Sequence, residues 1–275
     1  MKVGYTEFSF GYGFTENLIR SSLSAPTGAP VFPNLVQEAR LGYDVRIDFP
    51  AVPQFYQYKL PELMKRNTAF EITGGLCPGL TVSFFRIALM RRDLSRQHQH
   101  LIDWESCYPG NVFYAAPCLE TTGTFNSAYN ACAVHQRSVL FSPTDIGPLP
   151  DNKVHTIAYK SGLPVGYFCS EPRPVKALAF DGLGDRLRAQ FDDTRYTDCR
   201  SVARELRQNV LEGVSPVLRR AAPAMERRIR QALDQPRRAT PPTREEQQVR
   251  ADLLLAREIS RIGFGLDLMI AQPKA

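Results

Sequence analysis

The spacing of apolar and polar residues predicts that strands and helices alternate through the front part of the chain. "TVSFFRIALM" and "NVFYAAP" are rich in aromatic and β-branched residues, which is typical of strands, and "SVLFSP", "HTIAYK" and "VGYFCSEP" are shorter stretches of this kind. Helices are predicted for "FTENLIRSSL", with Thr15 as its N-cap, and for "SRQHQHLIDWESC", with Ser95 as its N-cap. This order of elements predicts an α/β (α+β) fold.

After about residue 180 the pattern becomes helical. Met225, Ile229 and Leu233 repeat at the spacing of one helix face. Thr243 and Glu246 then form a possible capping box, which predicts a long helix that ends near residue 262. We therefore expect two parts: an α/β domain over 1–180 and a basic helical region over 181–275.

The stretch "LGYDVRIDFPAVPQFYQYKL", residues 41–60, reads as a hairpin of two strands. Prolines at both ends of "PAVP" favour a reversal centred between Ala51 and Val52. Because side chains alternate between the two faces of a strand, this register gives one apolar and one polar face. The polar face carries Asp44, Arg46, Asp48, Gln57 and Lys59.

The polar face has the composition of a hydrolytic metal site. A carboxylate and an amide oxygen on adjacent strands can bind a hard cation such as Mg²⁺, and a lysine beside them can stabilise charge on a phosphate. The order of Asp44 followed by Gln57-Tyr58-Lys59 resembles the D…(E/Q)xK signature of the PD-(D/E)xK nuclease superfamily, in its glutamine variant. The preceding helix-like "LVQEARLGY" and the later "SRQHQHLIDWE" and "NVFYAAP" follow the order of elements in that family.

This resemblance implies a restriction-endonuclease-like mixed sheet flanked by helices, and hydrolysis of phosphodiester bonds with Mg²⁺ or Mn²⁺. The substrate would be DNA, with RNA not excluded, and the setting restriction or antiphage defence. Partners would be identical chains or another protein of a defence system. The implied ligands are Asp44, Gln57 and the Tyr58 carbonyl, with Glu38 as an accessory ligand, Lys59 assisting the nucleophile, and Asp48 and Glu16 as second choices.

Two other interpretations remain open at this point. The polar face could be the solvated side of an ordinary hairpin, with Asp44 and Lys59 as a surface pair. The fold could also serve as a noncatalytic scaffold or as a nucleic-acid-binding subunit. The neutral Gln57, where the family often has glutamate, is compatible with this interpretation. A phosphate-contact role for Arg96, Gln97 or His100 also stays open.

The charge of the chain is uneven. The net charge of +6 lies entirely in 200–275, where 15 basic residues, 14 of them arginine, outnumber 9 acidic ones. Arginine suits phosphate recognition, so we expect this region to contact a nucleic-acid backbone or to mediate assembly. The alternative is a solvated helical surface with internal ion pairs. The candidate contacts are Arg227, Arg228, Arg230, Arg237 and Arg238.

Composition indicates a globular protein, with 43% hydrophobic and 23% charged residues. The opening "MKVGYTEFSFGYGF" lacks the apolar run of a secretory signal, and no stretch predicts a membrane span, so we expect a cytoplasmic protein without a membrane partner. The six cysteines lack a CxxC pair, which predicts free, mostly buried thiols.

Overall fold

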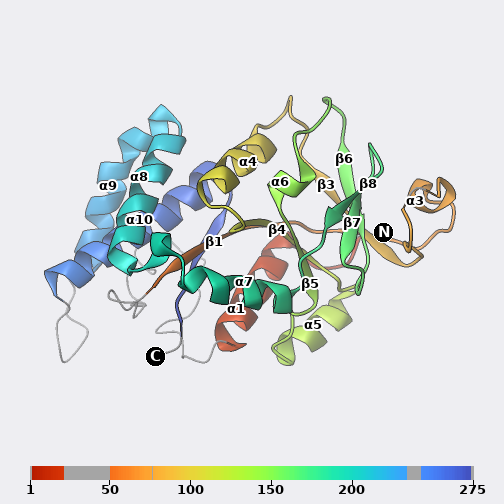
Figure 1. Ribbon diagram of the computed structural model, residues 1–275, viewed down its shortest axis with the longest axis horizontal. Coiled ribbons are helices and arrows are strands. Elements are labelled where there is room, and N and C mark those ends of the chain that lie inside the picture. The colour runs from red at the N-terminus through yellow and green to blue at the C-terminus, as the bar shows by residue number, and fades with distance from the viewer. Residues whose placement is uncertain (1, 22–49, 76, 234–242, 274–275) are drawn as a thin grey trace. The chain divides into compact units, whose positions relative to one another are not determined.

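The computed structural model describes residues 2–21, 50–75, 77–233 and 243–273. The chain divides into two compact units. Unit 1 comprises residues 1–21 and 56–184, and unit 2 comprises residues 22–55 and 185–275. Helices and strands are mixed along the chain, so the predicted α/β class is confirmed (Figure 1).

The helices are α1 (Glu7–Ser21), α3 (Phe70–Thr73), α4 (Gln97–Cys107), α5 (Thr122–Asn130), α6 (Pro143–Ile146), α7 (Phe180–Phe191), the 3₁₀ helix η1 (Thr194–Tyr196), α8 (Cys199–Gly213), α9 (Pro216–Leu233) and α10 (Arg244–Phe264). The strands are β1 (Val52–Tyr58), β2 (Glu62–Met64), β3 (Phe84–Leu89), β4 (Val112–Pro117), β5 (Ser138–Phe141), β6 (His155–Tyr159), β7 (Val165–Phe168), β8 (Arg173–Lys176) and β9 (Asp267–Ala271).

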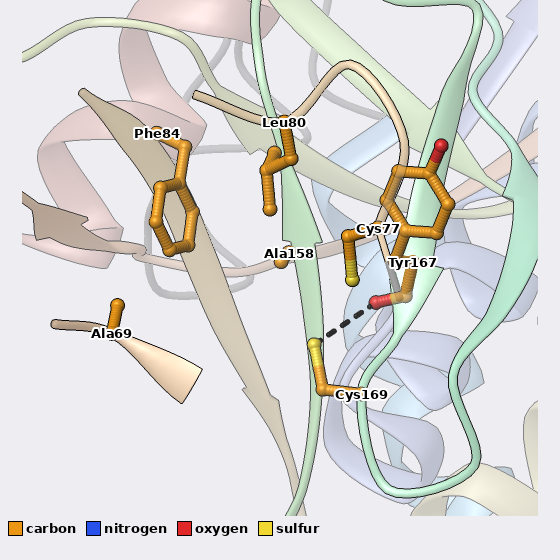
Figure 2. Packing of buried hydrophobic residues seen from close by; sticks show 7 residues of the cluster. All are labelled: Ala69, Cys77, Leu80, Phe84, Ala158, Tyr167 and Cys169. Atoms are coloured by element: carbon orange, nitrogen blue, oxygen red, sulfur yellow. Dashed lines mark hydrogen bonds between the residues drawn. The ribbon is translucent and has the colours of Figure 1, made fainter. Parts of the chain in front are cut away.

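Unit 1 contains an antiparallel sheet with the strand order β2-β3-β6-β7-β8. Its register pairs Phe85 with Tyr159 and Ile157 with Phe168. Figure 2 shows the apolar cluster on this sheet, in which the Cys169 thiol donates to the Tyr167 carbonyl at 3.3 Å. Burial raises the pKa of Cys169 to about 11, so this thiol stays protonated and packs as a small apolar group. The cluster consists of Ala69, Cys77, Leu80, Phe84, Ala158, Tyr167 and Cys169.

The second sheet has the order β5-β4-β1-β9, and residues 56–58 of β1 belong to unit 1. Within unit 1, α1 packs on one face of this sheet, where the rings of Phe14 and Tyr56 are 5.3 Å apart. Helix α4 packs on the other face, where the rings of His98 and Tyr114 stack at 5.8 Å. The strand pair β1–β4 is therefore covered by a helix on both sides.

Helix α1 begins at Glu7, so the predicted start with Thr15 as N-cap is wrong. Phe10 and Phe14 are four positions apart, and both rings are buried against β1. Gly11, a poor helix former, lies where a Cβ atom would approach the Tyr58 ring to 2.7 Å. The tight packing of this strand on the helix therefore outweighs the local preference of "SFGYGF" for an irregular or extended backbone.

The predicted reversal between Ala51 and Val52 is also wrong, because Val52 begins the continuous strand β1. The backbone N–H of Ala51 instead bonds to the Tyr196 carbonyl at 3.0 Å. Pro53 stands near the start of the strand, where a missing N–H is tolerated. The turn-forming preference of "PAVP" was therefore overridden by partners that are distant in the sequence.

Unit 2 contains the helices α8, α9 and α10, so the helical character predicted after about residue 180 is confirmed. Met225 and Ile229 of α9 are buried. Thr243 and Glu246 form the predicted capping box at the start of α10, with the Glu246 amide donating to the Thr243 hydroxyl at 3.1 Å. The predicted free cysteines are confirmed, although only Cys77, Cys169 and Cys199 are buried.

Candidate functional site

The residues Gln57, Tyr58 and Lys59 lie at the end of β1, where the strand is covered on both faces. Gln57 and Lys59 are two positions apart and lie on the α4 side, whereas Tyr58 lies on the α1 side. The predicted alternation of side chains in this stretch is therefore confirmed. A solvated position is contradicted for Gln57, whose exposed fraction is only 7%.

The carboxamide of Gln57 is held in place by α4. Its Oε1 atom accepts a hydrogen bond from Gln97 Nε2 at 2.9 Å, and its Nε2 atom donates to the Tyr58 carbonyl at 3.4 Å. An amide oxygen has two lone pairs, so Gln57 Oε1 can accept one further partner or bind a cation. Gln97 thus orients the carboxamide of Gln57.

Lys59 is half-buried beside the same helix. Its Nζ atom lies 5.7 Å from the centroid of the Tyr114 ring, and its backbone N–H bonds to the Ala115 carbonyl at 2.9 Å. Burial lowers the pKa of Lys59, and the negative charge of Glu7 opposes this shift. The amine of Lys59 is therefore easier to deprotonate than the amine of an exposed lysine. Its protonated form is attracted to anions.

Tyr58 secures the opposite face of the strand. Its hydroxyl shares a hydrogen bond of 2.7 Å with the Thr15 hydroxyl of α1, and its ring packs in an edge-on arrangement against Phe10. The glycine at position 11 leaves room for this ring. These contacts fix the strand, so that Gln57 and Lys59 are presented toward α4.

His98 supports the site through hydrogen bonds on both of its ring nitrogens. Its Nε2 atom lies 2.8 Å from the Gly147 carbonyl and must donate to it, so in the neutral ring Nδ1 accepts from the Tyr114 hydroxyl at 2.9 Å. Burial lowers the pKa of His98 and favours the neutral ring. The bond to Gly147 opposes that shift, and the charge of Lys59 adds to it. The sequence did not single out Tyr114, because the strand next to β1 could not be inferred from local pattern.

Of the remaining predicted ligands, Glu16 is the one that the described residues include. Glu38, Asp44 and Asp48 lie outside the described residues. Glu16 binds the Asn17 amide at 2.7 Å and pairs with Arg20 at 3.3 Å, and neither partner belongs to the group around Lys59. Across the parts of the chain that the structure describes, no group of three or more histidine, cysteine, aspartate or glutamate side chains is placed to hold a metal ion.

The predicted arginine contacts differ from one another. Arg227 and Arg228 are exposed on α9. Arg230 pairs with Glu226 at 2.7 Å and donates to Gln248, so it helps to join α9 to α10. Arg237 and Arg238 lie outside the described residues.

Comparisons with known proteins give no family. No family model matches the sequence, and no curated protein and no solved structure is significantly similar to the chain. Within the described ranges, no helix is both long and apolar enough to cross a lipid bilayer.

Proposed function

We propose that this chain is a metal-dependent nuclease that hydrolyses phosphodiester bonds in DNA, with Lys59 as its central charged residue. The observation that carries the proposal is the half-buried Lys59, with its lowered pKa, on the same side of β1 as the oriented Gln57. A lysine in this environment can take a proton from attacking water or donate to a phosphate oxygen.

The cation would be Mg²⁺ or Mn²⁺. The described part of its ligand set, the Gln57 carboxamide oxygen and the Tyr58 carbonyl, consists of oxygen atoms, which suit both ions. Asp44 would be the carboxylate ligand and Glu38 the accessory one, both on the sequence signature alone. When bound, such a cation lowers the pKa of water and neutralises charge on the phosphate.

The partners in this proposal follow from the same signature. DNA is the expected substrate and RNA remains possible chemically, because both have the phosphodiester group. Restriction or antiphage defence, in which the chain acts with identical chains or with another defence protein, is an analogy with the superfamily.

We expect Lys59→Met to reduce Mg²⁺-dependent cleavage of plasmid DNA by about 100-fold, the scale of losing one charge-stabilising donor. Because burial lowers the Lys59 pKa below its unfolded value, the charged amine destabilises the fold, and this effect is relieved as pH rises through the folded pKa. The variant should therefore keep or raise the melting temperature at pH 7, which separates lost chemistry from lost folding.

Lys160→Met is the matched control, because Lys160 is also half-buried in unit 1 and instead donates to the Thr81 hydroxyl at 2.6 Å. The cleavage rates of the wild type and both variants are measured as relaxation of supercoiled plasmid in Mg²⁺, in Mn²⁺ and in EDTA. Equal cleavage by wild type and Lys59→Met would reject the catalytic proposal, and so would absence of cleavage by the wild type.

A second candidate is a noncatalytic nucleic-acid-binding protein. It is favoured by the burial of Gln57 and its bond to Gln97, which satisfy this side chain without a cation, and by the exposure of Arg227 and Arg228. In this case Gln57 and Lys59 would have a structural role. The affinity for nucleic acid would come from the helices of unit 2.

We expect the double variant Arg227→Ser/Arg228→Ser to weaken DNA binding and to lower the slope of log K against log salt by about 2, because two phosphate contacts are lost. Fluorescence anisotropy with a labelled duplex at several salt concentrations measures this slope. Lys65→Ser/Arg66→Ser removes the same charge from exposed positions of unit 1 and is the control. An equal change in both double variants would indicate only a general charge effect.

A further inference from the structure

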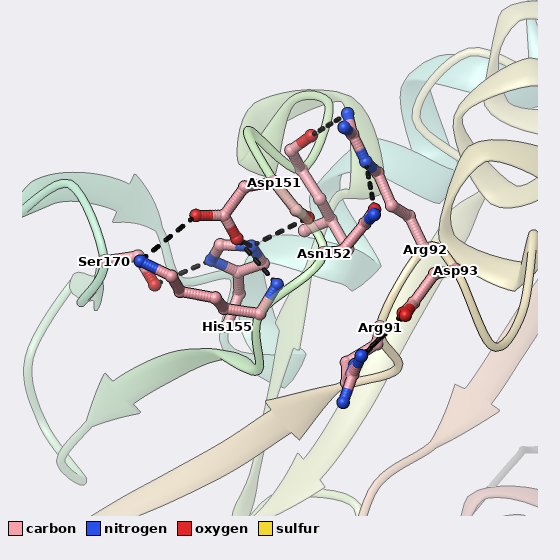
Figure 3. A network of polar contacts seen from close by, with 9 residues as sticks. Arg91, Arg92, Asp93, Asp151, Asn152, His155 and Ser170 are labelled. Atoms are coloured by element: carbon pink, nitrogen blue, oxygen red, sulfur yellow. Dashed lines mark hydrogen bonds and ion pairs between the residues drawn. The ribbon is translucent and has the colours of Figure 1, made fainter.

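Three polar residues of unit 1 form a chain of contacts at one end of the antiparallel sheet. His155, the first residue of β6, lies between Asp151 and Ser170 (Figure 3). The His155 Nδ1 atom is 2.7 Å from the Ser170 hydroxyl oxygen, and its Nε2 atom is 3.1 Å from Asp151 Oδ1. We infer that Ser170, His155 and Asp151 form a hydrolytic site for esters of short carboxylic acids, separate from the Lys59 site.

The contacts decide which nitrogen of His155 carries the proton. Both atoms near Nε2, the Asp151 carboxylate oxygen and the Asp151 carbonyl oxygen at 3.3 Å, can only accept hydrogen bonds. The neutral ring therefore carries its proton on Nε2, and Nδ1 presents a lone pair to the Ser170 hydroxyl. A serine activated by a histidine base needs this tautomer, and the carboxylate behind the ring maintains it.

Each of the three side chains has the accessibility that its role requires. Ser170 is exposed on the turn between β7 and β8, where an acyl group can reach its hydroxyl. His155 is buried, and its ring stacks on Phe168 at 5.4 Å, which holds the imidazole plane. The Asp151 side chain is 46% exposed, and hydrogen bonding to the Lys153 amide lowers the pKa of its carboxyl, so it remains charged behind the ring.

The sheet register brings these residues together. β6 and β7 pair with Ile157 opposite Phe168, and the Cys169 amide bonds to the Thr156 carbonyl at 2.9 Å. This pairing places the turn that begins after β7 beside the start of β6. The loop before β6 is anchored by Arg92, whose Nε atom donates to Asn152 Oδ1 at 2.6 Å, as Figure 3 also shows.

The reaction balances without a cofactor. The Ser170 oxygen attacks the acyl carbon of the ester while its proton passes to His155 Nδ1, and the departing alcohol takes that proton as the C–O bond breaks. Water then attacks the acylated serine, His155 accepts its proton, and Ser170 regains it when the carboxylic acid leaves. Because Ser170 lies on an exposed turn, a short acyl group, which needs little burial, fits this position.

The test uses the full chain with p-nitrophenyl acetate and with a fluorophosphonate reagent that labels activated serines. The expected results are a fluorophosphonate adduct on Ser170 by peptide mass spectrometry and about a 100-fold loss of ester hydrolysis in Ser170→Ala. Ser106→Ala is the control, because Ser106 is an exposed serine whose hydroxyl only donates to the Ile102 carbonyl.

Asp151 acts through His155 and is a positioning residue. Asp151→Asn should slow labelling of Ser170 about tenfold at an unchanged melting temperature, because the amide does not stabilise the imidazolium that forms during attack. Absence of an adduct on Ser170 in the wild type would overturn the inference. Equal ester hydrolysis by wild type and Ser170→Ala would also overturn it, and neither result depends on DNA cleavage.

Discussion

Phe141→Ala is expected to lower the free energy of unfolding by roughly 3–5 kcal/mol, the usual cost of truncating a fully buried aromatic ring. Phe141 ends β5, and its ring lies 5.5 Å from that of Tyr159 in the antiparallel sheet, in an edge-on arrangement. It also fills the space above Gly166, where a Cβ atom would approach Phe141 Cε1 to 2.8 Å. Its loss would open a cavity between β5 and the strands β6 and β7.

Urea unfolding followed by far-UV circular dichroism measures this effect through the shift of the midpoint. Phe8→Ala is the control, because Phe8 is 64% exposed and its truncation opens no cavity. Phe141→Leu keeps part of the apolar volume. Its loss in free energy of unfolding should be less than half of the loss in Phe141→Ala. A loss under about 1 kcal/mol for Phe141→Ala would mean that the site collapses around the missing ring.

Glu105→Ala is expected to lower the free energy of unfolding by about 3 kcal/mol, because it removes the acceptor of several hydrogen bonds inside unit 1. The buried carboxylate of Glu105 accepts from the Ser142 hydroxyl, 2.8 Å from each of its oxygens, and from the Thr144 amide, also at 2.8 Å. It thereby joins α4 to the first turn of α6. Without it, a hydroxyl and an amide N–H at the start of α6 lose their charged partner.

Glu105→Gln should cost less than the alanine variant, since the amide oxygen can still accept one of these bonds but carries no charge. Asp103→Ala is the matched control on the same helix, because Asp103 is exposed and only accepts from Gln99. The melting temperatures of Glu105→Ala, Glu105→Gln and Asp103→Ala, measured by thermal unfolding, rank the three variants by stability. Equal melting temperatures for Glu105→Ala and Asp103→Ala would show that solvent satisfies the α6 donors.

The local sequence pattern predicted a helix or strand correctly where the residues that favour it lie within that helix or strand. The strands around "SFFRIALM" and "NVFYAAP" and the helix capped by Thr243 are present, because β-branched and aromatic runs and capping boxes act over a few residues. The pattern gave a wrong start for α1, where packing against Tyr58 outweighs the local preference of the backbone. It also gave a wrong reversal at Ala51, whose N–H bonds to the Tyr196 carbonyl.

For the candidate sites, the sequence alone determined which residue types stand two apart on one strand, and hence that Gln57 and Lys59 share a face. Only the tertiary structure decided that this face is covered by α4 and that burial lowers the Lys59 pKa. The same is true of His155 and Ser170, which lie fifteen positions apart and meet through the β6–β7 register. Burial and strand pairing depend on segments distant in the chain, so neither can be inferred from the residues of one element.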